Sequence, residues 1–344
     1  MIRVLVVDDS AVVRRLVTTS LSLDPEIEVV GTATNGQEAI GRVDELQPDA
    51  VTLDIEMPVL DGLGALAAIR RRHPRLPIIM FSTLTEKGAT KTLEALSLGA
   101  SDFVTKPSNT TNMAESMASV REQLIPKMKA LIGVRRVAAA APPPPVRVAQ
   151  PAASRPEVLL IGCSTGGPDA LARVLEDMPA TLPVPVLVVQ HMPPLFTAMF
   201  AERLDRVSPL RVREAEAGDV VTAGEVLVAP GGHHLVLQRS AGTVRAVIDD
   251  GEPENFCRPA VDTLFRSAAQ VYGGKAVALV LTGMGHDGLA GCRLLAEQGA
   301  RIVVQDEETS VVWGMPGAVA GAGLAHEVLP LEAIAGKLAA VLGA

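Results

Sequence analysis

Short apolar runs alternate with longer amphipathic stretches through the first part of the chain. The runs have the length of β-strands, and in the stretches between them apolar residues recur every three or four positions, as on one face of a helix. The predicted strands cover residues 2–7, 27–31, 49–53, 77–81 and 101–104. The predicted helices cover residues 11–22, 36–46, 62–72, 88–97 and 111–132. Such an alternation predicts an α/β fold in which helices cover both faces of a five-stranded parallel sheet.

The second part of the chain repeats this alternation with one interruption. Its predicted strands cover residues 157–162, 184–190, 226–229, 276–281 and 301–305. Its predicted helices cover residues 168–176, 195–205, 259–271, 287–298 and 329–342. Residues 210–250 instead have the pattern of short strands and turns, and Arg239–Thr243 has the composition of a hairpin tip. We therefore expect a doubly wound α/β domain with a mainly parallel sheet and an antiparallel insert.

A segment of low complexity separates the two patterns. From Val134 to Pro156 the sequence consists largely of Ala, Pro, Arg and Val, and it contains the run Pro142–Pro145, which favours an extended conformation over packing. A chain of 344 residues is long enough for two ordinary domains. We expect a first domain at residues 1–123, a helix end and linker at 124–155, and a second domain at 156–344.

Composition limits the cellular setting. The three cysteines are widely spaced and predict neither a disulfide framework nor a Cys-x-x-Cys metal site, so a reducing compartment fits best. The chain opens directly on a strand-like run, and no apolar run approaches the roughly 18 residues of a membrane span. These features predict a cytoplasmic protein without membrane insertion.

Charge argues against a nucleic-acid partner. The chain carries a net charge of −8, and residues 156–344 contain 13 Lys and Arg against 22 Asp and Glu. Binding to phosphate backbones needs clustered Lys and Arg, which this acidic second domain lacks.

Polar residues gather at the predicted strand ends of the first domain. Asp8 and Asp9 follow the first strand, Asp54 the third, Ser82 and Thr83 the fourth, and Lys106 the fifth. The carboxyl ends of parallel strands meet at one sheet edge, where ligands bind. A single loop aspartate more often caps a helix, but a set in register favours a site. Three neighbouring carboxylates would repel one another unless a hard cation such as Mg²⁺ neutralises them.

At these residues the first domain resembles the response-regulator receiver domains, which have a flavodoxin-like fold. The resemblance rests on the motifs Val7-Asp8-Asp9-Ser10, Leu53-Asp54-Ile55-Glu56-Met57-Pro58 and Thr105-Lys106-Pro107. It implies that Asp54 accepts a phosphoryl group from a histidine kinase. It further implies that Mg²⁺ is held by Asp8, Asp9, the Asp54 carboxylate and the backbone carbonyl of Glu56. Ser82 and Lys106 would then respond to the phosphoryl group, and Phe103 stands where the family has a rotating aromatic residue, although core packing explains Phe103 equally well.

A serine follows the first strand of the second domain. The sequence Gly162-Cys163-Ser164-Thr165-Gly166-Gly167-Pro168 lies between a predicted strand and a predicted helix, and it matches G-x-S-x-G in the context that makes this motif informative. A glycine-rich turn before a helix also cradles phosphates, but the P-loop lysine and the G-x-G-x-x-G pattern are missing. Cys163 is a rival nucleophile, although its position directly after a buried strand favours a place in the core.

A serine nucleophile needs a base and an acid that orients the base. His191 follows the second strand of this domain, and Asp287 follows another buried strand within Thr282-Gly283-Met284-Gly285-His286-Asp287-Gly288. Three strand ends thus supply Ser164, His191 and Asp287 at one edge of the sheet. The order Ser, His, Asp differs from the order Ser, Asp, His of the α/β-hydrolases, so we do not expect that fold.

At these residues the second domain resembles the catalytic domain of the chemotaxis protein-glutamate methylesterases. Further matching segments are Gln190-His191-Met192-Pro193, Ala229-Pro230-Gly231 and Arg258-Pro259-Ala260-Val261-Asp262. Together with the receiver resemblance, nearly the whole chain is covered, in the same domain order. The family implies hydrolysis of glutamate γ-methyl esters on methyl-accepting chemotaxis receptors, and deamidation of receptor glutamines through the same acyl-enzyme.

The resemblance also assigns roles to residues. Ser164 would attack the γ-carbonyl, His191 would carry the proton, and Asp287 would orient the imidazole. The backbone N–H groups of Thr165, Gly166 and Met284 are our candidates for the oxyanion hole. No cofactor is expected for ester hydrolysis itself.

We expect the unphosphorylated first domain to cover the Ser164 edge and phosphorylation to release it, because a long proline-rich tether joins two otherwise complete domains. Two other interpretations stay open: a response regulator whose second domain only binds a partner, and a hydrolase of the same architecture that serves another pathway.

Overall fold

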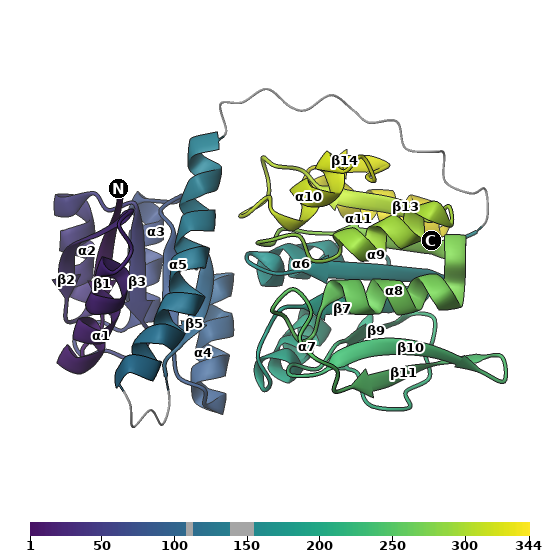
Figure 1. Cartoon of the computed structure of the whole chain (residues 1–344), viewed down its shortest axis with the longest axis horizontal. Coiled ribbons are helices and arrows are strands. Elements are labelled where there is room, and N and C mark those ends of the chain that lie inside the picture. The colour runs from purple at the N-terminus through teal and green to yellow at the C-terminus, as the bar shows by residue number, and fades with distance from the viewer. Residues whose placement is uncertain (108–112, 138–154) are drawn as a thin grey trace. The chain divides into compact units, whose positions relative to one another are not determined.

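The computed structural model describes residues 1–107, 113–137 and 155–344, and it divides into two compact units, Met1–Ala140 and Ala141–Ala344. The proline run at residues 142–145 lies outside the described residues. Each unit has its own sheet and its own core (Figure 1).

The described residues of the N-terminal unit form five strands and five helices in alternation. Its strands are β1 (Ile2–Val7), β2 (Ile27–Ala33), β3 (Ala50–Asp54), β4 (Ile78–Ser82) and β5 (Asp102–Thr105). Its helices are α1 (Ala11–Ser22), α2 (Gly36–Leu46), α3 (Gly62–Arg72), α4 (Glu86–Ser97) and α5 (Met113–Val137). All strand pairs are parallel, in the order β2-β1-β3-β4-β5. The predicted parallel α/β fold is therefore confirmed, with helices on both faces of the sheet (Figure 1).

Local sequence explains where these helices begin. The side chains of Ser10, Asn35, Asp61 and Thr85 each accept a hydrogen bond from a backbone N–H in the first turn of the following helix. Such caps satisfy N–H groups that have no partner within the helix. Helix α5 continues beyond the predicted end at residue 132, and its residues Leu124 and Met128 are fully buried.

The C-terminal unit is built on a seven-stranded parallel sheet in the order β14-β13-β12-β6-β7-β9-β8. The strands are β6 (Val158–Cys163), β7 (Val186–Gln190), β8 (Arg211–Glu214), β9 (Glu225–Val228), β12 (Ala276–Val280), β13 (Arg301–Gln305) and β14 (Glu327–Leu329). A separate antiparallel hairpin consists of β10 (His234–Ser240) and β11 (Thr243–Asp249). This hairpin is the predicted antiparallel insert.

The hairpin turn lies within the predicted tip. Ala241 and Gly242 both have positive φ, at 49° and 84°, as a two-residue turn between antiparallel strands requires. Two strands and one helix were not predicted individually. Strand β8 pairs in parallel at one edge of the main sheet, β14 has only three residues at the other edge, and helix α10 (Met315–Gly321) is a short element between β13 and β14.

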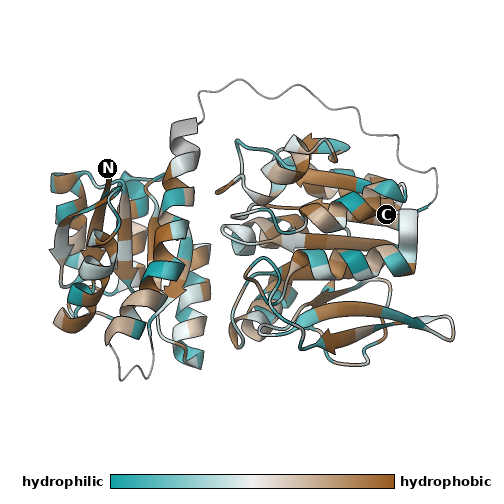
Figure 2. Ribbon diagram, viewed as in Figure 1, coloured by the Kyte–Doolittle hydropathy of each residue, from teal (hydrophilic) through white to brown (hydrophobic). Residues whose placement is uncertain are grey.

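Helices cover the central sheet in two groups. Helices α6 (Gly167–Glu176), α7 (Phe196–Val207) and α11 (Leu331–Leu342) pack side by side, and α8 (Val261–Tyr272) packs against both α9 (Leu289–Glu297) and β10. Alternate strand residues such as Leu160, Val189 and Val280 share one apolar core with α8, α9 and α10. The intervening strand residues, such as Leu279, are equally buried. Figure 2 shows the resulting apolar strands between amphipathic helices. Among the described residues, no helix is long and apolar enough to cross a bilayer.

The strand order contains a topological switch. The chain passes from β6 to β7 on one side, and β12 later adds on the other side of β6. The helices on the two sides of such a point lead away from each other, which leaves a crevice at the carboxyl ends of the strands. The strand ends of β6, β7 and β12 are therefore where a site is expected.

The interior strand β12 should carry much of the stability of the C-terminal unit. Leu279 on β12 is fully buried, so Leu279→Ala removes packed methyl groups and leaves a cavity. We expect it to lower the free energy of unfolding by about 2–5 kcal/mol. Urea unfolding followed by the fluorescence of Trp313, the only tryptophan, measures this unit directly. The control Leu294→Ala, on the partly exposed side of α9, should cost less than about 1 kcal/mol, and equal losses in the two variants would contradict the assignment of the core.

Candidate active site

Three of the predicted site residues lie at the switch-point edge of the C-terminal sheet. Ser164 follows β6 directly, His191 follows β7 directly, and Asp287 lies in the loop between β12 and α9. Because β6 and β7 pair in register up to Cys163 and Gln190, Ser164 and His191 leave adjacent strands side by side. The backbone N–H of His191 donates to the carbonyl of Cys163 at 3.2 Å, which extends this pairing to the site itself.

The turn that carries Ser164 is fixed by backbone hydrogen bonds. The Ser164 N–H donates to the carbonyl of Thr282 at 3.0 Å, and the Gly167 N–H donates to the carbonyl of Ser164 at 2.8 Å. Gly166 has a φ of 78°, a conformation that glycine adopts without strain. The turn leads directly into α6, so the hydroxyl of Ser164 lies close to a helix N-terminus, which favours negative charge.

Gln190 ties the Ser164 turn to the His191 turn. Its side-chain Nε2 donates to the carbonyl of Ser164 at 3.0 Å and to the carbonyl of His191 at 3.2 Å. Its Oε1 lies 2.1 Å from the place where a Cβ at position 167 would stand, so any larger residue there would displace the Gln190 side chain. A buried glutamine thus fixes the spacing between two of the candidate residues.

His191 and Asp287 form a buried ion pair. The Nε2 atom of His191 lies 2.7 Å from Oδ2 of Asp287, and both side chains are largely inaccessible. Burial by itself lowers the pKa of His191, but the hydrogen bonds to Asp287 and Cys257 outweigh it and raise this pKa to about 9. Burial likewise raises the pKa of Asp287, but the bond to His191 dominates and lowers it to about 2. At neutral pH the resting pair is therefore an imidazolium and a carboxylate.

The carboxylate of Asp287 is also the anion at the N-terminus of α8. It accepts hydrogen bonds from the backbone N–H groups of Val261 at 2.7 Å, Asp262 at 3.0 Å and Gly288 at 2.9 Å. The first N–H groups of a helix have no partner within the helix and attract negative charge. Helix α8 therefore fixes the orientation of the Asp287 carboxylate. This carboxylate in turn fixes the orientation of the His191 ring.

A second buried carboxylate lies beside Asp287. Asp262 is almost fully buried, and burial together with the charge of Asp287 raises its pKa to about 6. The side-chain amide of Asn255 donates to both carboxylates, at 3.1 Å each, and the Gly291 N–H donates to Asp262 at 2.7 Å. A neutral amide between two acids satisfies both without adding charge.

The remaining ring nitrogen of His191 faces a cysteine. Cys257 Sγ lies 3.5 Å from His191 Nδ1, whereas the hydroxyl of Ser164 makes no hydrogen bond among the described residues. The structure thus brings the three residues to one edge and forms the His–Asp contact, but not the Ser–His contact. Such contacts are often long in resting enzymes and tighten when substrate binds.

Two backbone N–H groups near Ser164 are available to an incoming oxygen. Within the described part of the chain, the N–H groups of Gly166 and Met284 donate to no other group. The preceding residue, Gly283, passes so close to Ser164 that a Cβ on it would stand 2.9 Å from the Ser164 Cβ. Thr165 is buried, and its carbonyl accepts a hydrogen bond from Thr282 Oγ1 at 2.9 Å, which fixes the start of this turn.

Two neighbouring residues have the positions that the sequence predicted. Cys163 is fully buried and its pKa is strongly raised by burial, so it belongs to the core. His286 is exposed, whereas Asp287 beside it is buried, so the two side chains diverge.

The N-terminal unit holds the second predicted site. The carboxylates of Asp8, Asp9 and Asp54 lie at one sheet edge, and their ligand oxygens are within 4.8 Å of one another. Lys106 Nζ lies 2.9 Å from Asp8 Oδ2 and 2.8 Å from Asp54 Oδ1. Burial, with repulsion from Asp8, raises the pKa of Asp54 to about 6 despite the bond to Lys106.

The residues present fit a divalent cation. Asp8 Oδ2 is buried and forms no well-directed hydrogen bond, although Lys106 is within ion-pair distance. Three carboxylates with a free oxygen are the donor set that Mg²⁺ prefers. The side chain of Glu56 instead pairs with Lys87 and Lys91 at 3.1 Å and 3.0 Å, which leaves only its backbone for the predicted metal contact.

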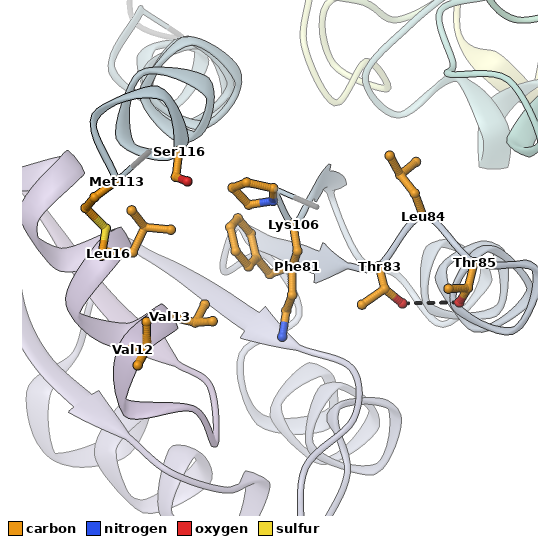
Figure 3. A pocket seen from close by; sticks show the side chains of 11 residues that line it. Val12, Val13, Leu16, Phe81, Thr83, Leu84, Thr85, Lys106, Met113 and Ser116 are labelled. Carbon is orange, nitrogen blue, oxygen red and sulfur yellow. Dashed lines mark hydrogen bonds between the residues drawn. The ribbon is translucent and has the colours of Figure 1, made fainter. Parts of the chain in front are cut away.

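Two of the three predicted switch residues, Ser82 and Phe103, are packed inward. Ser82 is buried and accepts a hydrogen bond from Thr92 Oγ1 at 2.6 Å. Phe103 is also buried, and Lys127 Nζ lies 5.4 Å from the centre of its ring. An apolar pocket of about 640 Å³ lies beside this site, between α1, the loop after β4 and the start of α5. Figure 3 shows the Lys106 side chain at this pocket. Val12 and Val13 lie on one side of Lys106, and Thr83 and Thr85, which are hydrogen-bonded to each other, lie on the other side.

Sequence reasoning missed the supporting residues of the first site. Residues 249–255 have the pattern of a solvated turn that could also line the substrate cleft, and this pattern gave Asn255 no specific partner. Gln190, Thr282 and Asp262 were noticed only as parts of motifs. Gln305, whose Oε1 accepts a 2.8 Å hydrogen bond from the Thr282 N–H and so holds the Met284 loop, drew no attention. The only available signal was the burial expected for a polar residue at a strand end, which does not reveal its partner.

Comparison with known proteins agrees with this two-site architecture. Residues 159–338 match the family model of the CheB methylesterase, and residues 4–118 match that of the response regulator receiver domain. A protein-glutamate methylesterase/protein-glutamine glutaminase of Nocardioides sp. is 53% identical over 339 residues, which is 96% of this chain and 92% of that protein. A protein of the same name from Trichodesmium erythraeum is 45% identical over 99% of both chains.

A solved structure agrees for the C-terminal unit. The CheB methylesterase catalytic domain of Thermotoga maritima is 43% identical, covers 54% of this chain and 98% of that one, and superposes with a TM-score of 0.53. A family model that spans more than half of the chain, and relatives that match nearly all of it, identify the protein at the level of its family. The chain belongs to the CheB methylesterase family and carries a response regulator receiver domain before its catalytic domain.

Proposed function

We propose that this protein is a phosphorylation-controlled hydrolase that removes methyl groups from glutamate γ-methyl esters of chemotaxis receptors and deamidates receptor glutamines. The names of its relatives support this substrate class. The observation that carries the proposal is the buried His191–Asp287 pair beside Ser164, at the switch-point edge of a parallel sheet. The reaction would take place at the cytoplasmic part of the receptors.

Acylation requires a neutral imidazole. Because Asp287 is hydrogen-bonded to Nε2, Nδ1 is the nitrogen that accepts the proton of Ser164. The thiol of Cys257, which contacts Nδ1 in this structure, must move away for this to happen. The Ser164 oxygen then bonds to the γ-carbonyl carbon, and the carbonyl π-electrons move to its oxygen. The N–H groups of Gly166 and Met284 are available to that oxyanion, and each such donor typically contributes about 10²–10³-fold to the rate.

Collapse of the intermediate completes the first half of the reaction. The bond from the carbonyl carbon to the methoxy oxygen breaks, His191 returns its proton to that oxygen, and methanol leaves. Water then attacks the acyl-enzyme while His191 again accepts a proton, and Ser164 is released with the free glutamate. A glutamine substrate follows the same course with ammonia as the leaving group.

The receiver domain would control this reaction through Asp54. A histidine kinase would supply the phosphoryl group. Asp8, Asp9, Asp54 and the Glu56 carbonyl would hold Mg²⁺, which would supply positive charge for the transfer. Lys106 already bridges Asp8 and Asp54, so a phosphoryl group on Asp54 must rearrange this ion pair. Phosphorylation adds about −1.5 to −2 charges, which Lys106 and Ser82 are positioned to meet. We propose that this change relieves inhibition of the catalytic domain by the receiver domain.

Loss of the nucleophile should abolish activity. Ser164→Ala removes the attacking oxygen, so methanol release from methylated receptor membranes should fall by about a thousandfold or more. Ser240→Ala, an exposed serine beside the hairpin turn, is the matched control and should retain full activity. An unimpaired Ser164→Ala variant would favour a binding module over an enzyme.

The rate should depend on pH through His191. Only the neutral imidazole accepts a proton, and the pKa of His191 is raised to about 9, so kcat/KM should rise as the pH increases toward 9. Asp287→Asn removes the charge that raises this pKa. We expect the activity of this variant to be about 10²–10⁴-fold lower, and its kcat/KM to rise over a lower pH range than that of the unchanged protein. A rise that stays in the same pH range in Asp287→Asn would show that another group controls the titration.

Asp54→Asn should uncouple the two domains. Addition of the phosphorylated kinase and Mg²⁺ should stimulate methanol release by the unchanged protein and have no effect on this variant. Glu122→Gln, an exposed acid on α5, is the control and should respond normally.

Removal of the receiver domain tests the direction of control. The fragment 156–344 contains the whole C-terminal core, so it should be more active than the unphosphorylated full chain. Equal activities would mean that the receiver domain does not inhibit.

A further inference from the structure

Phe256 differs from every other phenylalanine of the chain. The chain contains six, and five of them are buried: Phe81, Phe103, Phe196, Phe200 and Phe265. The side chain of Phe256 is 102% exposed, so its ring contributes nothing to the packing of the core. Large aromatic rings are costly to leave in water, and in folded proteins they are typically found in cores and interfaces.

A defined turn holds this ring outward. Asn255 and Phe256 have positive φ angles of 52° and 63°, which is uncommon for any residue and rare for a bulky one. Backbone bonds between Glu254 and Cys257, at 3.0 Å and 2.9 Å, close the turn. The carboxylate of Glu254 in turn accepts hydrogen bonds from Thr263 Oγ1 at 3.0 Å and from Arg266 Nη1 at 3.1 Å. The exposure of Phe256 is therefore a property of a fixed turn.

The residues on either side of Phe256 both reach the candidate active site. Asn255 Nδ2 lies 3.1 Å from Asp287 Oδ1, and Cys257 Sγ lies 3.5 Å from His191 Nδ1. A residue between these two cannot be far from the histidine and the aspartate, because consecutive Cα atoms are about 3.8 Å apart. Phe256 therefore stands beside the site to which a polypeptide would bring its ester.

We propose that Phe256 is a substrate-contact residue that packs against an apolar side chain of the receptor, and that this side chain lies about one turn from the reacting glutamate on a helical receptor segment. The inference rests on the proposed function and names a determinant of its specificity. Residues three or four positions apart lie on the same face of a helix, so a methylated glutamate in the active site places such a neighbour within reach. The apolar ring selects an apolar neighbour, and its fixed turn limits the entropy lost on binding.

The Phe256 side chain has two alternative partners: the receiver domain of the same chain and a second copy of the protein. The substrate is preferred because catalysis itself brings it to the residues that flank Phe256. Neither competing contact is required by the geometry of the site.

The test compares a large and a small substrate in the full-length protein. Phe256→Ala should raise KM for methylated receptor membranes by about tenfold, with kcat nearly unchanged, since removal of a buried aromatic contact typically has an effect of this size. The γ-methyl ester of N-acetylglutamate lacks the helix, so its hydrolysis should be unaltered. Phe256→Leu should restore most of the receptor activity, because an apolar contact remains. Val207→Ala, an exposed residue at the far end of α7, is the control and should leave both activities unchanged.

Other outcomes overturn the inference. An unchanged KM for the receptor means that the ring does not contact it. Equal losses on both substrates mean that Phe256 acts on the catalytic residues. A rise in the activity of the unphosphorylated protein means that the ring contacts the receiver domain, and a change in sedimentation without a change in KM means that it joins two copies. If the unaltered protein hydrolyses the small ester but not the receptor ester, the proposed function fails instead.

Discussion

The candidate active site depends on the hydrogen bonds that the buried carboxylate of Asp287 accepts. This carboxylate collects the first N–H groups of α8, the amide of Asn255 and the imidazole of His191. A buried charge is stable only when it is paired and hydrogen-bonded, so all these groups must be in place together. The same contacts that make the carboxylate tolerable in the interior also fix the direction of the imidazole. The contacts that stabilise the loops are therefore the same contacts that set the geometry of the site.

The parallel sheet makes this arrangement possible. Strands β6, β7 and β12 are adjacent and run in the same direction, so the residues that follow them reach one edge. Support comes from a second layer of buried polar groups, among them Gln190 and Thr282, which bind backbone carbonyls of the Ser164 turn. A side chain on a turn held in this way has little freedom to move, and such preorganisation is what electrostatic catalysis needs.

The pKa values of two buried aspartates, Asp54 and Asp287, are shifted in opposite directions. In the receiver domain, burial and the nearby Asp8 raise the pKa of Asp54 to about 6, and a single lysine balances the cluster. In the catalytic domain, the contact with His191 lowers the pKa of Asp287 to about 2. The first environment suits a group that is to be modified and to share a cation, because its charge is poorly satisfied. The second suits a group whose charge is to remain constant through a reaction.

The sequence by itself determined the order of the main strands and helices, the two-domain organisation, and the residues at the strand ends. These follow from local patterns: apolar periodicity, helix caps such as Ser10 and Asp61, and glycines around Ser164. Elements with little local signal, such as the three-residue β14 and the short α10, were not predicted, because only their neighbours stabilise them.

Only the tertiary structure decided which polar groups meet. Residues 249–255 have the pattern of a solvated turn, yet Asn255 lies between two buried acids that are 7 and 32 positions away in the chain. The choice of His191 Nε2 for Asp287 and of Nδ1 for Cys257 likewise depends on three separate loops. The physical reason is that a hydrogen bond depends on distance and direction within a few tenths of an ångström, and no pattern along the chain encodes such distances between remote segments.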